Sequence, residues 1–107
     1  MLLIRAIIRP NMVGNVLKKL EEAGYPAVTK MDVYGRGKQK GIKIGDVFYD
    51  ELPKEMLLMV VEENEKEAVI NIIMDNARTG TEGNNGDGRI FVSEIDEAYT
   101  ISTKSKG

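Results

Sequence analysis

Two short segments combine glycine with cationic side chains, and both have the composition of an anion site. Residues 35–41 read GRGKQKG and residues 79–89 read TGTEGNNGDGR. Glycine lets backbone N–H groups approach an anion closely, and lysine or arginine adds the opposite charge. Neither segment contains the phosphate motifs G-x-x-x-x-G-K-[ST] or G-x-G-x-x-G. On pattern alone, solvated turns are the stronger interpretation and a phosphate site is the alternative.

The residues that enzymes use most often are scarce in this chain. Cysteine and histidine are both absent, which excludes thiolate nucleophiles, histidine triads and histidine-ligated zinc. The carboxylates Asp46, Asp50 and Glu51 lie in a polar stretch without an apolar wall to raise a pKa, so we interpret them as a solvated loop. We therefore expect no enzyme. A weak phosphohydrolase is the alternative, and Asp87 would have to be its base.

Length and charge define a small protein with few default partners. The chain has 107 residues, enough for one domain, and its net charge is −2 with a sequence pI of about 5.2. Without a basic surplus, nucleic acid is not an expected partner. No apolar stretch approaches the ~20 residues of a membrane span, and Arg5 interrupts the apolar start of the chain. A cytoplasmic location is expected.

Hydrophobic periodicity predicts the elements that must hold the two loops. Residues 2–9 alternate as a strand does, and 56–61 form a continuous apolar run typical of a buried strand. Asn11 and Asn64 are expected to cap helices that end near Ala23 and Ala77. The other predicted strands are 27–34 and 89–95, residues 35–54 follow neither period, and the tail from 99 to 107 is expected to be extended and then frayed.

The order β-α-β-β-α-β predicts an α+β, ferredoxin-like sandwich. Its four-stranded antiparallel sheet would carry both helices on one face, with a long excursion between strands 2 and 3. The other face would then be bare and apolar, with either Leu57 and Met59 or Met56 and Leu58 on it. Because bare apolar faces of this size usually mark association, we expect a small closed oligomer.

Four segments carry a family resemblance over nearly the whole chain. They are RAIIRPNMVGNVLKKLEEAGYPAVT, VYGRGKQKG, LPKEMLLMVV and ARTGTEGNNGDGRIFV, of which GDGRIFV is the most specific piece. Together they resemble the PII signal-transduction proteins. The resemblance implies one PII-like domain over 1–107, with a T-loop at about 36–54, a B-loop at about 79–89 and a C-terminal tail at 99–107.

One branch of that family is closer than the rest. The pieces KMDVYGRGKQKG and DVFYDELPKEM resemble the PII-like regulators linked to nitrogen fixation in archaea and some anaerobic bacteria. That likeness implies a trimer that senses ATP or ADP together with 2-oxoglutarate. It also implies that the protein binds and inhibits nitrogenase (the dinitrogenase component) when ammonium is plentiful. The protein would act together with a second PII-like paralogue, with which it could form a mixed oligomer. The alternatives are a general PII regulator of ammonium transport or glutamine synthetase, and a ferredoxin-like oligomer that uses no nucleotide.

The resemblance also assigns a nucleotide site between two subunits. Gln39 resembles the residue that touches both Mg²⁺ and 2-oxoglutarate, and its neutral amide suits a magnesium ligand. Lys54 resembles the lysine that pairs with the far carboxylate of 2-oxoglutarate. The residues assigned to the site by likeness are Ile7, Thr29, Gly35, Gly37, Lys38, Gln39, Lys40, Lys54, Gly86, Asp87, Gly88 and Arg89.

The sequence departs from the family pattern at three places that bear on this site and its control. Thr100 and Ser102 stand where the last strand usually supplies arginines to the phosphates, and each lost charge-assisted contact costs about 1.5–3 kcal/mol. The B-loop is a few residues longer than TG-x-x-GDG. The T-loop is shorter and has no clear match to the tyrosine that enteric members uridylylate. Control by ligand is therefore expected rather than control by uridylylation.

Overall fold

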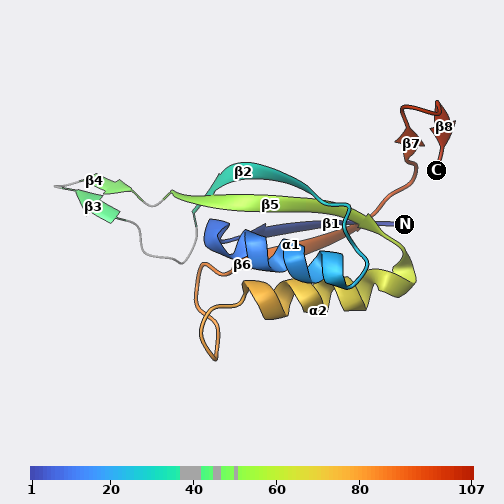
Figure 1. The fold of residues 1–107 in the computed structure, drawn as a ribbon. Coiled ribbons are helices and arrows are strands. Elements are labelled where there is room, and N and C mark those ends of the chain that lie inside the picture. The colour runs from blue at the N-terminus through green and yellow to red at the C-terminus, as the bar shows by residue number, and fades with distance from the viewer. Residues whose placement is uncertain (37–41, 45–46, 50) are drawn as a thin grey trace.

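Four strands of the chain form one antiparallel sheet, and two helices lie along it (Figure 1). The computed structural model describes residues 1–36, 42–44, 47–49 and 51–107. The sheet strands are β1 (Leu2–Ile8), β2 (Thr29–Gly35), β5 (Leu52–Val61) and β6 (Gly88–Glu94). The helices are α1 (Val13–Glu22) and α2 (Lys66–Ala77), preceded by the 3-10 turns η1 (Pro10–Met12) and η2 (Glu63–Glu65).

The strand order is β2-β5-β1-β6, and every neighbouring pair is antiparallel. Strand β1 lies in the centre, where it pairs with β5 on one side and β6 on the other. The first and last sheet strands of the chain are therefore neighbours, while β2 and β6 form opposite edges. The predicted ferredoxin-like sandwich, with a long connection between its second and third sheet strands, is confirmed.

The core lies between the sheet and the two helices because alternate sheet residues face the helices. Leu57 and Met59 are buried on this face, with exposed fractions of 1% and 5%. Helix α1 and helix α2 each contribute an apolar stripe at helical spacing. The buried residues of the core are Leu2, Ile4, Ala6, Ile8, Val13, Val16, Leu20, Leu57, Met59, Val61, Val69, Ile73 and Ala77.

The opposite face of the sheet carries no helix. Of the two pairs proposed for it, Met56 and Leu58 occupy it, since Leu57 and Met59 face the helices. The register places Met31 and Ile7 beside Met56 on this face. Hydrophobic side chains along it are only partly covered, and they include Met31, Val60 and Phe91 with exposed fractions of 42%, 50% and 46%. We call this surface the open sheet face.

Two small hairpins extend the predicted fold. Strands β3 (Ile42–Ile44) and β4 (Val47–Tyr49) pair within the segment between β2 and β5, so part of the 35–54 excursion is strand. Strands β7 (Tyr99–Thr100) and β8 (Ser105–Lys106) pair near the C-terminus, so the expectation of a frayed tail is wrong. The β3–β4 hairpin projects from one end of the sheet and β7–β8 lies at the other (Figure 1). Periodicity missed both hairpins because each strand has only two or three residues.

The helix starts also differ from the predictions. Asn11 lies inside η1, and the residue that caps α1 is Met12, which makes no side-chain capping bond. Asn64 lies inside η2, which begins instead with a capping box between Glu62 and Glu65. No helix in the described ranges is long and apolar enough to cross a membrane.

Candidate functional site

The B-loop is organised around one carboxylate, that of Asp87. Its Oδ1 accepts hydrogen bonds from Arg9 Nε at 3.0 Å and from Thr79 Oγ1 at 2.6 Å. Its Oδ2 accepts from the backbone N–H groups of Thr79 at 3.0 Å and Asn84 at 2.9 Å. The side chain of Asn84 closes the loop further by donating to the carbonyl and the hydroxyl of Thr79. Both ends of the loop and the end of β1 are therefore fastened to the same group.

These donors decide the charge state of Asp87. Burial opposes the charged form, but the hydrogen bonds from Thr79, Asn84 and Arg9 outweigh it and hold the pKa of Asp87 well below its usual range. A carboxylate with four donors and a depressed pKa is a poor proton acceptor at neutral pH. The alternative in which Asp87 acts as an enzyme's base is therefore not supported by its surroundings.

Two cations hold consecutive carbonyl groups of the same loop. Arg9 Nη2 donates to the Asn85 carbonyl at 2.9 Å, and Lys54 Nζ donates to the Gly86 carbonyl at 2.6 Å. Lys54 is only 8% exposed. Burial and the neighbouring Arg9 lower the pKa of Lys54, whereas Asp87 raises it. Since Lys54 lies in β5 just after the T-loop, this contact joins the exit of the T-loop to the B-loop.

Gly88 brings the end of the B-loop against β1. Its φ is +122°, and a Cβ placed there would lie 1.8 Å from the Ile7 carbonyl oxygen. That separation is impossible for any side chain, so only glycine allows this approach. In the ladder that follows, Arg89 lies opposite Ile7. The resemblance assigned these three residues to one site, and they are adjacent here.

The structure brings together about half of the residues assigned to the site by likeness. Gly35 packs beside Lys54, since a Cβ on it would lie 3.3 Å from Lys54 Cγ. Thr29 lies six residues before Gly35 in β2, opposite Leu58. It is thus on the far edge strand from β6. The remaining assigned residues, Gly37, Lys38, Gln39 and Lys40, lie outside the described residues.

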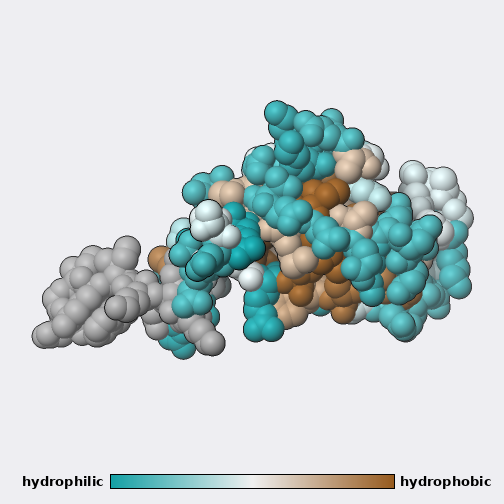
Figure 2. Space-filling model, turned by 90° about the horizontal axis from the view of Figure 1, so that it is seen from below, coloured by the Kyte–Doolittle hydropathy of each residue, from teal (hydrophilic) through white to brown (hydrophobic). Residues whose placement is uncertain are grey.

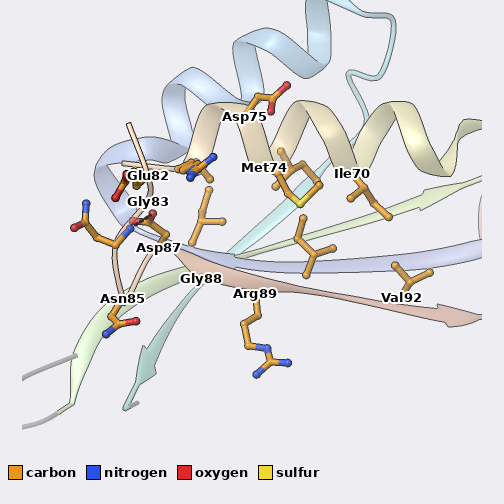
Figure 3. Close-up of a pocket in the computed structure, with 16 residues that line it drawn as sticks. Ile70, Met74, Asp75, Glu82, Gly83, Asn85, Asp87, Gly88, Arg89 and Val92 are labelled. Atoms are coloured by element: carbon orange, nitrogen blue, oxygen red, sulfur yellow. Dashed lines mark hydrogen bonds between the residues drawn. The ribbon is translucent and has the colours of Figure 1, made fainter. Parts of the chain in front are cut away.

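A groove of about 810 Å³ opens beside this cluster, between α2, β6 and the B-loop. Ile70 and Met74 reach from α2 toward β6, while Arg89 points away from the helix (Figure 3). One wall is apolar and the B-loop end is polar. In the view from below, hydrophobic residues gather over the middle of the body and hydrophilic residues surround them (Figure 2). Within the described part of the chain, no group of three acidic side chains could hold a metal ion.

Sequence reasoning missed Arg9, Thr79 and Asn84, the donors that hold Asp87. A partial signal existed, because Arg9 is the last residue of a predicted strand and precedes Pro10, where the chain must turn. Thr79 and Asn84 carried no signal beyond turn composition, since their role depends on a carboxylate several residues later. Of the three loop carboxylates interpreted as solvated, Glu51 is exposed, and Asp46 and Asp50 lie outside the described residues.

Comparison with known proteins accounts for this combination of fold and loops. The family model described as nitrogen regulatory protein P-II matches residues 1–105. The chain belongs to the P-II family. Proteins of this family are nitrogen regulatory proteins. Among solved structures, Arabidopsis thaliana PII bound to citrate matches 99% of this P-II chain and 84% of its own, with a TM-score of 0.78 and 32% identity.

Curated relatives of this P-II protein carry a more specific description. A nitrogen fixation nifHD1 region GlnB-like protein 1 from Methanosarcina barkeri is 57% identical over 107 residues, covering 100% of this chain and 99% of the relative. A nifHD region counterpart from Methanococcus maripaludis is 55% identical with the same coverage. A GlnB-like protein 2 from Methanothermococcus thermolithotrophicus is 38% identical over 120 residues, covering 95% of this chain and 91% of the relative. Two kinds of nif-region GlnB-like protein therefore match this chain.

We predict that Gly88→Ala destabilises the fold by about 2 kcal/mol or more, because the new Cβ overlaps the Ile7 carbonyl and the backbone conformation is strained. Gly14→Ala is the matched control. Gly14 lies in α1, and a Cβ added there would meet nothing within 4 Å, so alanine should stabilise by about 0.5–1 kcal/mol through helix propensity. Urea unfolding at fixed protein concentration measures both. Equal stability of the Gly88 variant and the parent would contradict the close approach.

We predict that Asp87 makes the free energy of unfolding fall as the pH is lowered. Since its folded pKa lies below the unfolded value of about 3.8, its contribution is complete above that value and disappears as pH falls toward the folded pKa. We expect Asp87→Asn to be less stable than the parent at pH 7. The gap should narrow progressively below about pH 4, because the unfolded parent then takes up a proton at Asp87 while the folded parent still keeps this side chain charged. Urea midpoints of both proteins across this range test it, and a gap that does not change with pH would refute it.

Proposed function

We propose that this protein is a cytoplasmic, nitrogen-fixation-linked PII regulator that senses ATP or ADP with 2-oxoglutarate and inhibits nitrogenase when ammonium is plentiful. The observation that carries this proposal is the end-to-end match, above 50% identity, to relatives described by the nifHD region. This match favours the nitrogen-fixation branch over a general regulator of ammonium transport or glutamine synthetase. It also favours a regulator over a ferredoxin-like oligomer that uses no nucleotide.

The nucleotide phosphates would bind at the B-loop. Gly86, Gly88 and Arg89 lie at the end of the sheet from which Gly35 leads into the T-loop, and backbone N–H groups with nearby cations suit a phosphate chain. As the family likeness implies, Mg²⁺ would bind the phosphates together with Gln39. Lys38 and Lys40 would line the same nucleotide site. Thr100 donates its hydroxyl to the Gly107 carbonyl inside the β7–β8 hairpin, so affinity would depend chiefly on the loops.

2-Oxoglutarate would bind beside the nucleotide with one carboxylate at Lys54. This ammonium group is largely buried and already turned toward the B-loop. Arabidopsis PII, which is similar over 99% of this chain, has a solved structure bound to citrate, another small polycarboxylate. A carboxylate at Lys54 would supply the charge that offsets the cost of burying this cation. The ligand would then select one arrangement of the T-loop by binding it better than the others.

A trimer would complete the site and cover the open sheet face. Thr29 lies on edge strand β2, away from edge strand β6 and its Arg89, so a neighbouring copy is the simplest source of its contribution. The open sheet face offers partly covered Met56, Leu58 and Phe91 for burial between copies. The match to GlnB-like protein 2 supports a paralogue as the alternative partner in a mixed oligomer.

Ligand sensing predicts that 2-oxoglutarate binds only when MgATP is present. Titration calorimetry should give heat with MgATP and none without it, because the nucleotide completes the carboxylate site. Lys54→Met should weaken 2-oxoglutarate binding by about 10-fold or more through loss of a charge-assisted contact. Lys19→Met is the matched control, since Lys19 is half exposed on α1 and pairs with Glu22. Absence of heat at millimolar 2-oxoglutarate with MgATP would refute sensing by this chain.

Docking through the T-loop predicts that deleting residues 42–50 abolishes capture of nitrogenase while nucleotide binding persists. The segment contains the β3–β4 hairpin, which projects from one end of the sheet (Figure 1). A pull-down of purified dinitrogenase by the full chain and by the deletion variant measures capture. Adding MgATP with 2-oxoglutarate should release the enzyme from the full chain. Capture by the deletion variant would refute docking by this loop.

A further inference from the structure

Arg9 is one of the two cationic residues through which the sheet holds the B-loop. Its guanidinium divides its contacts between a side chain and the main chain, with Nε on Asp87 Oδ1 at 3.0 Å and Nη2 on the Asn85 carbonyl at 2.9 Å. The side chain is 23% exposed, so this fork is largely enclosed. Arg9 directly follows β1, the central strand, and therefore transmits the position of the sheet to the loop.

The contact with the Asn85 carbonyl fixes where a neighbouring backbone donor points. The peptide between Asn85 and Gly86 is trans, so its carbonyl and its N–H lie on opposite sides of the chain. With the carbonyl turned toward Arg9, the N–H of Gly86 must point away from Arg9. The next N–H, that of Asp87, is used inside the loop by the Asn84 carbonyl at 3.1 Å. Gly86 has a φ of +94°, a conformation that side chains rarely adopt.

The charges near this donor favour an anion. Arg9, Lys54 and Arg89 carry three positive charges and Asp87 carries one negative charge, so these four side chains together carry a net charge of +2. Both oxygens of the Asp87 carboxylate already accept hydrogen bonds from Arg9, Thr79 and Asn84. The negative charge of Asp87 is therefore compensated by these donors.

We propose that Arg9 is a positioning residue for phosphate binding: by holding the Asn85 carbonyl, it aims the Gly86 N–H at a phosphate group on the opposite side of the loop. Arg9 does not touch the phosphate itself. The identity of that phosphate as part of ATP or ADP rests on the proposed function, whereas the aim of the donor rests on the geometry. Lysine cannot replace arginine here, because a single ammonium group does not present the planar fork that reaches both acceptors.

The test uses the ¹⁵N-labelled full chain and two probes, inorganic tripolyphosphate and MgATP. In the parent, either probe should shift the Gly86 amide resonance. Arg9→Lys should weaken tripolyphosphate binding by about 10-fold or more while adenosine binding is unchanged, because only the phosphate loses a donor. Arg5→Lys, an exposed position on β1, is the matched control and should bind as the parent does.

Several results would overturn the proposal. A Gly86 amide in the parent that responds to neither probe does so, and this measurement does not depend on how any variant folds. Parent-like tripolyphosphate affinity in Arg9→Lys also overturns it, as does an equal loss for adenosine and MgATP, which indicates a merely structural role. A parent that binds tripolyphosphate through Gly86 but shows no preference for MgATP supports the positioning role while contradicting the proposed nucleotide sensing.

Discussion

The carboxylate of Asp87 is the constraint on which the rest of the candidate site depends. A long glycine-rich loop has many accessible conformations and therefore a large entropy to lose on ordering. Four donors from Arg9, Thr79 and Asn84 converge on this one group and select a single conformation. A charged acceptor makes each of these hydrogen bonds stronger than a neutral one would be. The loop is thus ordered by charge and hydrogen bonding rather than by an apolar core of its own.

The B-loop that Asp87 holds in place is connected to both ends of the T-loop through the sheet. Strands β1, β5 and β6 are neighbours, and each ends or begins near the B-loop. Lys54, on β5, contacts the Gly86 carbonyl, and Gly35, at the end of β2, packs on Lys54. The entrance and the exit of the T-loop are therefore both connected to the B-loop through one side chain. A ligand that changes the partner of Lys54 changes a contact that both loops share, which is the physical requirement for coupling them.

Sequence patterns were sufficient to predict those strands and helices whose buried residues recur at a regular spacing. Alternation in β1 and the apolar run in β5 gave the central strands, and the stripes of α1 and α2 gave the helices, because burial on one face imposes a period. Hydrophobic periodicity predicted this strand only from residue 56, whereas β5 begins at Leu52. The earlier residues of β5 pair with β2 rather than fill the core, so they carry no apolar pattern. Helix caps were misplaced for a similar reason: the capping box of Glu62 and Glu65 competes with Asn64, and composition does not rank them.

The candidate site was predictable only where the residue type itself carries the chemistry. Glycine and lysine content marked the two loops, and likeness to the PII family supplied Lys54 and the GDGR segment. The donors around Asp87 were not predictable, because they are joined across 78 residues in the case of Arg9 and depend on the final register of β1 and β6. Likewise, the requirement for Gly88 comes from the Ile7 carbonyl, which only the folded ladder places beside it.

In the proposed oligomer, the open sheet face would make the stability of the folded chain depend on its concentration. A partly covered apolar surface gains free energy when another copy covers it, so association and folding draw on the same buried area. Dilution would then loosen each subunit as well as separate the subunits. A paralogue with a similar apolar face would bind in place of another copy, and burial of the two faces would stabilise both chains. The relative abundance of the two chains would thereby set both the composition of the oligomer and the lifetime of its members.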